Sequence, residues 1–103
     1  MIRHIVLVRF KPEVSETRVA GIFGALPKLS AKLSGVINFT CGRSESPEKM
    51  ERGFMHGFTI DFSSWEALAN YADDPDHKVF GGQLVGNAVG GVDGILVFDL
   101  EVK

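Results

Sequence analysis

The sequence has few of the residues and runs that mark secreted or membrane-bound proteins. Only one of its 103 residues is a cysteine, Cys41, so no disulfide can form within the chain, and this fits a reducing cytoplasm. No apolar run approaches the roughly 20 residues that cross a bilayer. Residues 1–4 predict the start of a strand rather than a signal peptide. We therefore expect a cytoplasmic protein with no membrane partner.

An excess of one charge is also lacking. Thirteen acidic and eleven basic residues give a formal net charge of −2 with neutral histidines. The basic residues are scattered singly and form no stripe. Because surfaces that bind phosphate backbones concentrate lysine and arginine, we expect no nucleic-acid partner.

Motifs for metals and nucleotides are absent as well. The histidines and the cysteine show no His-x-x-x-His or Cys-x-x-Cys spacing, so we expect no metal site. The glycine-rich residues 81–91 lack the Gly-Lys-Ser/Thr ending of a phosphate loop, and no G-x-G-x-x-G fits them. Close packing and a flexible turn explain these glycines. We expect no nucleotide and no cofactor.

The apolar content, by contrast, is ample for one packed domain. Apolar residues make up 45% of the chain, including eight phenylalanines. A disordered chain lacks such surface, so disorder is excluded. Residues 1–103 are expected to form a single domain with a radius of gyration of roughly 13 Å.

Local patterns predict four strands, and they lie at residues 2–10, 36–43, 54–62 and 95–102. Between the first two, Ser15 is a good N-cap for a helix that is kinked at Pro27 and has Gly35 as its C′ residue. Residues 63–66 form a capping box for a second helix. Its expected buried face consists of Trp65, Leu68, Ala69 and Ala72.

A proline divides this second helical part in two, because Asp74 and Pro75 end one helix and begin another. The element order is therefore β-α-β-β-α-β. This is the ferredoxin-like α+β class, with a four-stranded antiparallel sheet covered by helices on one face.

The other face of this sheet is expected to be apolar and therefore to be buried against another surface. The two central strands, residues 2–10 and 54–62, carry apolar or aromatic residues at most positions of both faces. The chain has no further helix to cover the second face. A second copy is the natural candidate, so we expect a homodimer in which two sheets form a closed barrel.

With these elements placed, the chain resembles the stress-responsive α/β-barrel (Dabb) family over essentially its whole length. The resemblance is carried by residues 2–7 with Phe10 and Lys11, by Gly35 and Val36, by His56, and by Tyr71 with residues 74–77. It implies a homodimeric α/β barrel. Some plant members are polyketide cyclases that use a tyrosine and a histidine, which match Tyr71 and His77. The broader superfamily includes cofactor-free monooxygenases.

Four side chains are candidates for chemistry: His4 on the first strand, His56 on the third, and Tyr71 and His77 on either side of the helix break. We expect all four to converge on one pocket between the sheet and the broken helix. The expected ligand-binding residues are His4, His56, Phe23, Phe58 and Phe80. Their composition favours a small, largely apolar ligand.

The expected catalytic pair is His77 and Tyr71. The positive end of a helix dipole disfavours the cationic form of His77, and a neutral imidazole can accept a proton as a general base. Tyr71 would stay protonated and donate a hydrogen bond to a developing enolate oxygen. This pair predicts a cofactor-free cyclase or isomerase.

Plainer interpretations compete with these. His4 and His56 can be packed side chains bonded to the backbone, and Cys41 is best interpreted as a small buried strand residue. The protein can then be a non-catalytic, stress-related barrel that binds an apolar ligand, or alternatively a cofactor-free monooxygenase. An enclosed cavity reached by both His77 and Tyr71 would favour an enzyme.

Overall fold

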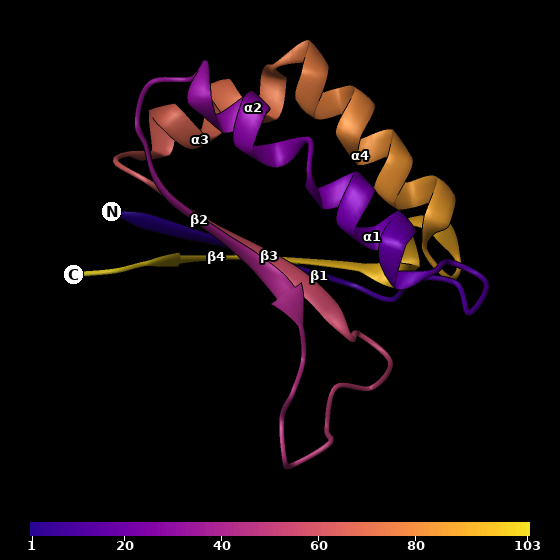
Figure 1. Ribbon diagram of the computed structural model, residues 1–103. Helices are drawn as coiled ribbons and strands as arrows, with labels where there is room; N and C mark the ends of the chain where they lie inside the picture. The colour runs from indigo at the N-terminus through magenta and orange to yellow at the C-terminus, as the bar shows by residue number, and fades with distance from the viewer.

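The sheet and its helical cover form two layers (Figure 1). The computed structural model describes all 103 residues. Its elements are β1 (Ile2–Val8), α1 (Glu16–Phe23), α2 (Leu26–Ala31), β2 (Val36–Arg43), β3 (His56–Phe62), α3 (Trp65–Asp73), α4 (Pro75–Asn87), the 3-10 helix η1 (Gly91–Gly94) and β4 (Ile95–Glu101). The strands run in the order β2-β3-β1-β4, and all neighbours are antiparallel. This is the expected ferredoxin-like α+β arrangement.

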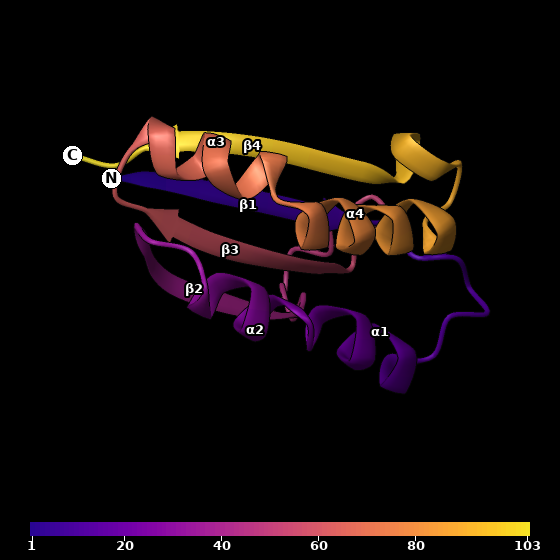
Figure 2. The same cartoon turned by 90° about the horizontal axis from the view of Figure 1, so that it is seen from above.

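All four α-helices cover one face of the sheet, and the opposite face, here called the outer face, carries no helix (Figure 1). Seen from above, α1 and α2 lie on the β2 side while α3 and α4 lie toward β1 (Figure 2). The radius of gyration is 13.4 Å, close to the size expected from length. None of the helices combines the length and apolarity needed to cross a bilayer.

The core lies between the sheet and the helices. Along β1, the alternate residues Ile2, His4, Val6 and Val8 are buried beneath the helices, and the residues between them are half-buried. Helix residues such as Ile22 and Leu26 pack on these buried strand residues. Period-two alternation in the strands and helical spacing in α1 thus produce one apolar layer.

The expected kink at Pro27 is a complete break. α1 ends at Phe23 with Gly24 as its C-cap, and α2 starts again at Leu26 with the proline in its first turn. A proline there loses nothing, because the first amides of a helix have no partner inside it. α2 ends at Ala31, before the end expected from Gly35 as the C′ residue. Gly35, with φ +88°, instead forms the entry into β2, where a side chain would strike Ala67.

The buried face of α3 differs from the expected one. Ala67 and Tyr71 are buried, whereas Trp65 is 54% exposed. Apolar spacing alone favours the row through Leu68 and Ala72. The row through Tyr71 prevails because its ring fits on the sheet beside Phe62, with ring centroids 5.2 Å apart.

Two expectations about the strands also fail. Cys41 is exposed rather than buried, because it lies on the edge strand β2. On β3 the outer face carries Gly57, Thr59 and Asp61, so this central strand is not apolar on both faces. The apolar side chains of the outer face come from β1 and from the edge strand β4.

Candidate functional site

His77 is positioned by the break between α3 and α4. Asp74 caps α4 through a hydrogen bond from the Asp76 amide (2.8 Å), and Pro75 takes the first helical position. His77 follows at the third position, as expected, and its Nδ1 lies 3.2 Å from the carbonyl oxygen of Ala72. A carbonyl can only accept, so Nδ1 carries the proton. The neutral ring therefore keeps its lone pair on Nε2.

The surroundings of His77 favour this neutral form. Burial lowers the pKa of the imidazole below its usual value, and the nearby His4 lowers it further. The Ala72 carbonyl and Asp74 act in the opposite direction but do not reverse the shift. The amino end of α4 also disfavours a cation. His77 thus presents an unprotonated Nε2 at neutral pH.

Tyr71 is packed against this histidine. The ring centroids of Tyr71 and His77 are 4.3 Å apart, and those of Tyr71 and His4 are 5.7 Å apart. The tyrosine is only 1% exposed, and its hydroxyl is buried without a hydrogen-bond partner. Burial raises the pKa of the phenol well above its usual value. The hydroxyl is therefore a proton donor at every physiological pH.

His4 completes the cluster from the sheet side. It is 8% exposed, and its Nδ1 lies 2.6 Å from a carboxylate oxygen of Asp99, the residue directly opposite on β4. Its partner is thus a carboxylate and not the backbone. A carboxylate that accepts from Nδ1 fixes the ring orientation of a histidine. Sequence patterns do not single out Asp99, because only the β1–β4 register brings it to His4.

A cavity of about 510 Å³ lies between α3, α4 and the β1–β4 half of the sheet. Most of its wall is apolar, and its ionisable groups are His4, His77 and Asp99. Phe58 and Phe80, two of the predicted ligand-binding residues, form part of the wall. Tyr71 is not part of the lining surface but lies behind His4 and His77. The arrangement joins a neutral base to an apolar pocket of small-molecule size.

His56 does not join this cluster, contrary to the expectation that four side chains converge. It pairs with Val8 at one end of β1, whereas His4 pairs with Ile60 nearer the other end. Four residues of strand span about 13 Å, so His4 and His56 share a face without meeting. His56 Nε2 instead lies 2.9 Å from a Glu16 carboxylate oxygen.

Phe23, like His56, does not line the His77 cavity. Together with His56 it lines a second cavity of about 260 Å³ between α1 and β2. The two cavities are separated by a row of rings packed edge to face. Phe58 contacts Phe23 on one side and Phe80 on the other, with centroids 5.6 Å and 5.7 Å apart. The expected ligand-binding residues therefore divide between two sites. No group of three or more His, Cys, Asp or Glu side chains is arranged to hold a metal ion.

The fold and the site define a ferredoxin-like α+β protein with an apolar cavity and a histidine at a helix start. The chain belongs to the stress-responsive A/B barrel domain (Dabb) family, whose profile matches residues 2–102.

Among curated relatives, the stress-response A/B barrel domain-containing protein HS1 of Arabidopsis thaliana is 29% identical over 100 residues, which cover 97% of this chain and 88% of that protein. Olivetolic acid cyclase of Cannabis sativa is 24% identical over 80 residues, 78% of this chain and 79% of that enzyme.

Solved structures share the fold over nearly the whole chain. A dimeric ferredoxin-like protein of unknown function from Jannaschia sp. CCS1 has a TM-score of 0.91 at 34% identity and covers 98% of both chains. Hydroxynitrile lyase from Passiflora edulis has a TM-score of 0.84 at 21% identity, covering 99% of this chain and 93% of its own. At that identity the likeness concerns the fold alone.

Proposed function

We propose that this chain is a homodimeric enzyme that binds a small, largely apolar carbonyl compound in the His77 cavity and removes a proton next to the carbonyl. One observation carries the proposal: the Ala72 carbonyl holds the proton of His77 on Nδ1, which leaves a free Nε2 lone pair on a residue lining the 510 Å³ cavity.

The proposed reaction uses side chains alone. His77 Nε2 takes the proton from the α carbon, and the electrons of the broken C–H bond form an enolate whose charge develops on the carbonyl oxygen. The Tyr71 hydroxyl is buried without a partner behind the wall formed by His4 and His77, and in this proposal it donates a hydrogen bond to that oxygen once substrate binding opens the wall. In an isomerase the proton then returns from His77 to another carbon. In a cyclase the enolate attacks a second carbonyl carbon, and the alkoxide formed there takes the proton back from His77.

The relatives support an enzyme of this kind. Olivetolic acid cyclase is named for a cyclisation, and a positioned base suits such a reaction. The plant cyclases that the chain resembles use a tyrosine and a histidine matching Tyr71 and His77. The Asp99–His4 pair adds a second oriented imidazole to the same wall.

Hydrogen–deuterium exchange tests the proposal without knowledge of the natural substrate. The protein is incubated in D2O with a panel of small 1,3-diketones, β-keto esters and aryl methyl ketones, and loss of the α-proton signal is followed by NMR. We expect saturable exchange faster than in buffer for at least one class. Exchange at the buffer rate throughout the panel would contradict the proposal.

The pH dependence gives a second expected result. Since His77 must be neutral to act and its pKa is lowered, the acid limb of kcat/KM for exchange should be displaced below the ordinary histidine value of about 6.5. The acidic midpoint is expected below 6.5. By linkage, the stability from neutral His77 is complete above pH 6.5 and is lost as pH falls toward its folded-state pKa. An acidic midpoint at or above 6.5 would exclude His77 as the base.

The homodimer is proposed because two solved structures of this fold, from Jannaschia sp. CCS1 and Thermobifida fusca, are described as dimeric, and because the outer face carries exposed apolar side chains. Sedimentation velocity at micromolar concentration is expected to give the mass of two chains. The mass of one chain at all concentrations would contradict it.

A second candidate function has one specific observation in its favour. Tyr71 lies behind the cavity wall and its hydroxyl is closed off, which suits a barrel that binds an apolar ligand without transforming it. Such a protein would bind members of the panel and exchange none of their protons.

A further inference from the structure

The residues just before His77 carry negative charge. Asp73, Asp74 and Asp76 all lie within four residues of it in the chain. A carboxylate close to an imidazole favours the cationic form of the ring, and a cation cannot accept a proton as the proposed reaction requires. The proposed base therefore needs a group that offsets this charge.

Lys32 brings a positive charge to this place from another helix. It is the C-cap residue of α2, and its Nζ lies 3.1 Å from Asp74 Oδ1 and 2.5 Å from Asp76 Oδ2. The same Asp74 oxygen accepts the hydrogen bond from the Asp76 amide (2.8 Å) that caps α4. One lysine thus bridges two carboxylates of the turn that positions His77.

Both sides of this bridge are ionised at neutral pH. The bonds to Asp76 and Asp74 raise the pKa of Lys32. Burial raises the pKa of Asp74, whose side chain is 13% exposed, but the bonds from Lys32 and from the α4 amides outweigh burial and lower it. Because Asp74 is largely shielded from water, its charge acts on its neighbours more strongly than a fully solvated charge would.

The ionisable groups around the His77 ring come from several elements. Tyr71 of α3 packs against the ring, and His4 of β1 and its partner Asp99 of β4 line the same cavity. Besides burial, His4 lowers the pKa of His77, whereas Asp74 at the start of α4 raises it. Asp74 is therefore the neighbour whose charge works against the base.

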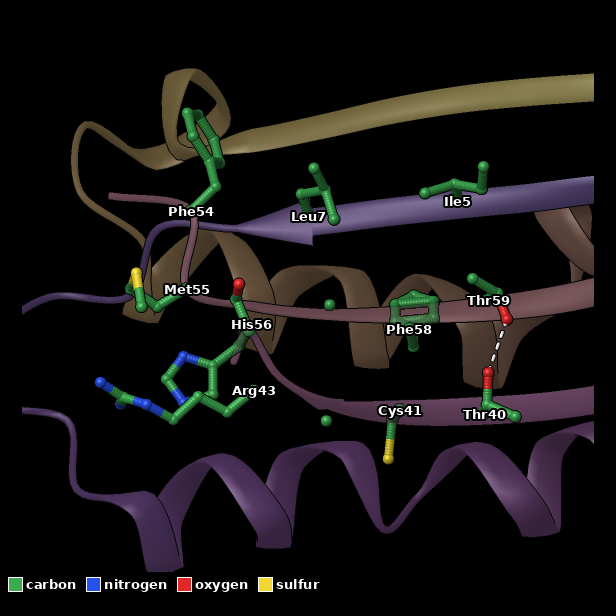
Figure 3. A pocket seen from close by; sticks show the side chains of 13 residues that line it. Ile5, Leu7, Thr40, Cys41, Arg43, Phe54, Met55, His56, Phe58 and Thr59 are labelled. Atoms are coloured by element: carbon green, nitrogen blue, oxygen red, sulfur yellow. Dashed lines mark hydrogen bonds between the residues drawn. The ribbon is translucent and has the colours of Figure 1, made fainter. Parts of the chain in front are cut away.

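His56 shows what a carboxylate does when it bonds to the ring itself. Its Nε2 lies 2.9 Å from a Glu16 oxygen, and Arg43, which lies beside His56 in Figure 3, bonds to the same carboxylate at 2.6 Å. Because a carboxylate only accepts, Nε2 of His56 carries a proton and cannot take another. The carboxylates before His77 bond to the lysine instead, and Nε2 of that ring stays free.

We infer that Lys32 is a positioning residue for the proposed base: its ammonium group holds the two carboxylates at the start of α4 away from the His77 ring and offsets their charge, so that the ring stays neutral. The inference rests on the proposed function, since it explains how that base stays neutral beside an acidic turn. Lys32 acts through Asp74 and Asp76 and does not touch the substrate. Its loss therefore changes the proton affinity of His77 without removing the base.

A ¹⁵N NMR titration of His77 tests this role and needs no substrate. Lys32→Met removes the charge and keeps most of the length of the side chain. We expect the titration midpoint of His77 to move to higher pH, with a rise of about two- to fourfold in proton affinity, the effect of a unit charge roughly 10 Å away in surroundings between protein and water. In α-proton exchange, the acid limb should move the same way while the alkaline plateau and KM stay near the wild type.

Three further variants separate charge from packing. Lys32→Arg keeps the charge and should keep the wild-type midpoint. Lys28→Met removes a lysine one turn earlier that borders the same groove between α2 and α4, and the midpoint should not move. Adding Asp74→Asn to Lys32→Met removes one negative charge, and asparagine still caps a helix. The midpoint should then return toward the wild-type value, which a loss of packing would not allow.

The failures of this role and of the proposed function are distinguishable. An unchanged midpoint in Lys32→Met would refute the role of Lys32, as would an equal shift in Lys28→Met or a double variant whose midpoint does not return. If Lys32→Met does not fold, which thermal unfolding shows, Lys32→Gln provides the same comparison. A wild type that exchanges no α-protons would refute the proposed function, and the midpoints would still decide whether Lys32 keeps His77 neutral.

Discussion

Replacing His77 with alanine is expected to slow enzyme-dependent α-proton exchange by a factor of about 10² to 10⁴, the usual contribution of a positioned general base. The fold should persist, because His77 is only partly buried and its one hydrogen bond goes to the Ala72 carbonyl, which lies at the end of α3. The measurement is the exchange rate by NMR, compared with the thermal midpoint of the same variant.

Two controls separate a catalytic role from a structural one. Lys78→Ala alters the next, exposed residue of α4, and its exchange rate should match the wild type. Adding imidazole to His77→Ala should restore part of the lost rate, because the small base can enter the space left by the side chain. A variant that keeps its full rate, or that loses rate only in proportion to its loss of folded protein, would refute His77 as the base.

The change Tyr71→Phe is expected to move rate and stability in opposite directions. Losing the hydrogen bond to a developing oxyanion typically costs about 10²- to 10³-fold in rate. The folded protein should be as stable as the wild type or more so, because the deleted hydroxyl is buried without a partner. Relief of an unsatisfied buried group is worth about 1–3 kcal/mol, and each kcal/mol raises Tm by roughly 4–8 °C in a domain of this size.

Either of two results would contradict this account of Tyr71. An unchanged rate would mean that the hydroxyl does not reach the substrate and that the ring serves only to pack against Phe62, His4 and His77. A large drop in Tm would mean that the hydroxyl makes a stabilising bond within the protein. Rate and Tm are therefore measured on the same preparation.

Much of the fold was predictable because its signals are local. The proline at position 27 and the Asp74–Pro75 pair interrupt helices through their own backbone chemistry, wherever the helices lie. Alternation in β1 identifies the side that carries His4. The third position of His77 in α4 follows from the same cap.

The site was harder to predict because it depends on register. Alternation places His4 and His56 on the same face, but only the pairing of β1 with β3 shows that they lie at different ends. Asp99 likewise reaches His4 only through the β1–β4 register. On α3, apolar spacing allowed more than one buried row, and the fit of the Tyr71 ring against Phe62 selected between them.

The prediction that β3 is apolar on both faces was wrong, although the evidence against it was present in the sequence. The alternation that places Phe58 and Ile60 beneath the helices also places Gly57, Thr59 and Asp61 on the other side of β3. The apolar side chains of the outer face gather on one side only once β4 is placed beside β1.

The central claim is that His77 presents an unprotonated Nε2 to the cavity, and ¹⁵N NMR of the histidine side chains tests it without any substrate. The expected spectrum at neutral pH has the His77 proton on Nδ1, with a titration midpoint below 6.5. A proton on Nε2 at neutral pH, or a midpoint at or above 6.5, would contradict it.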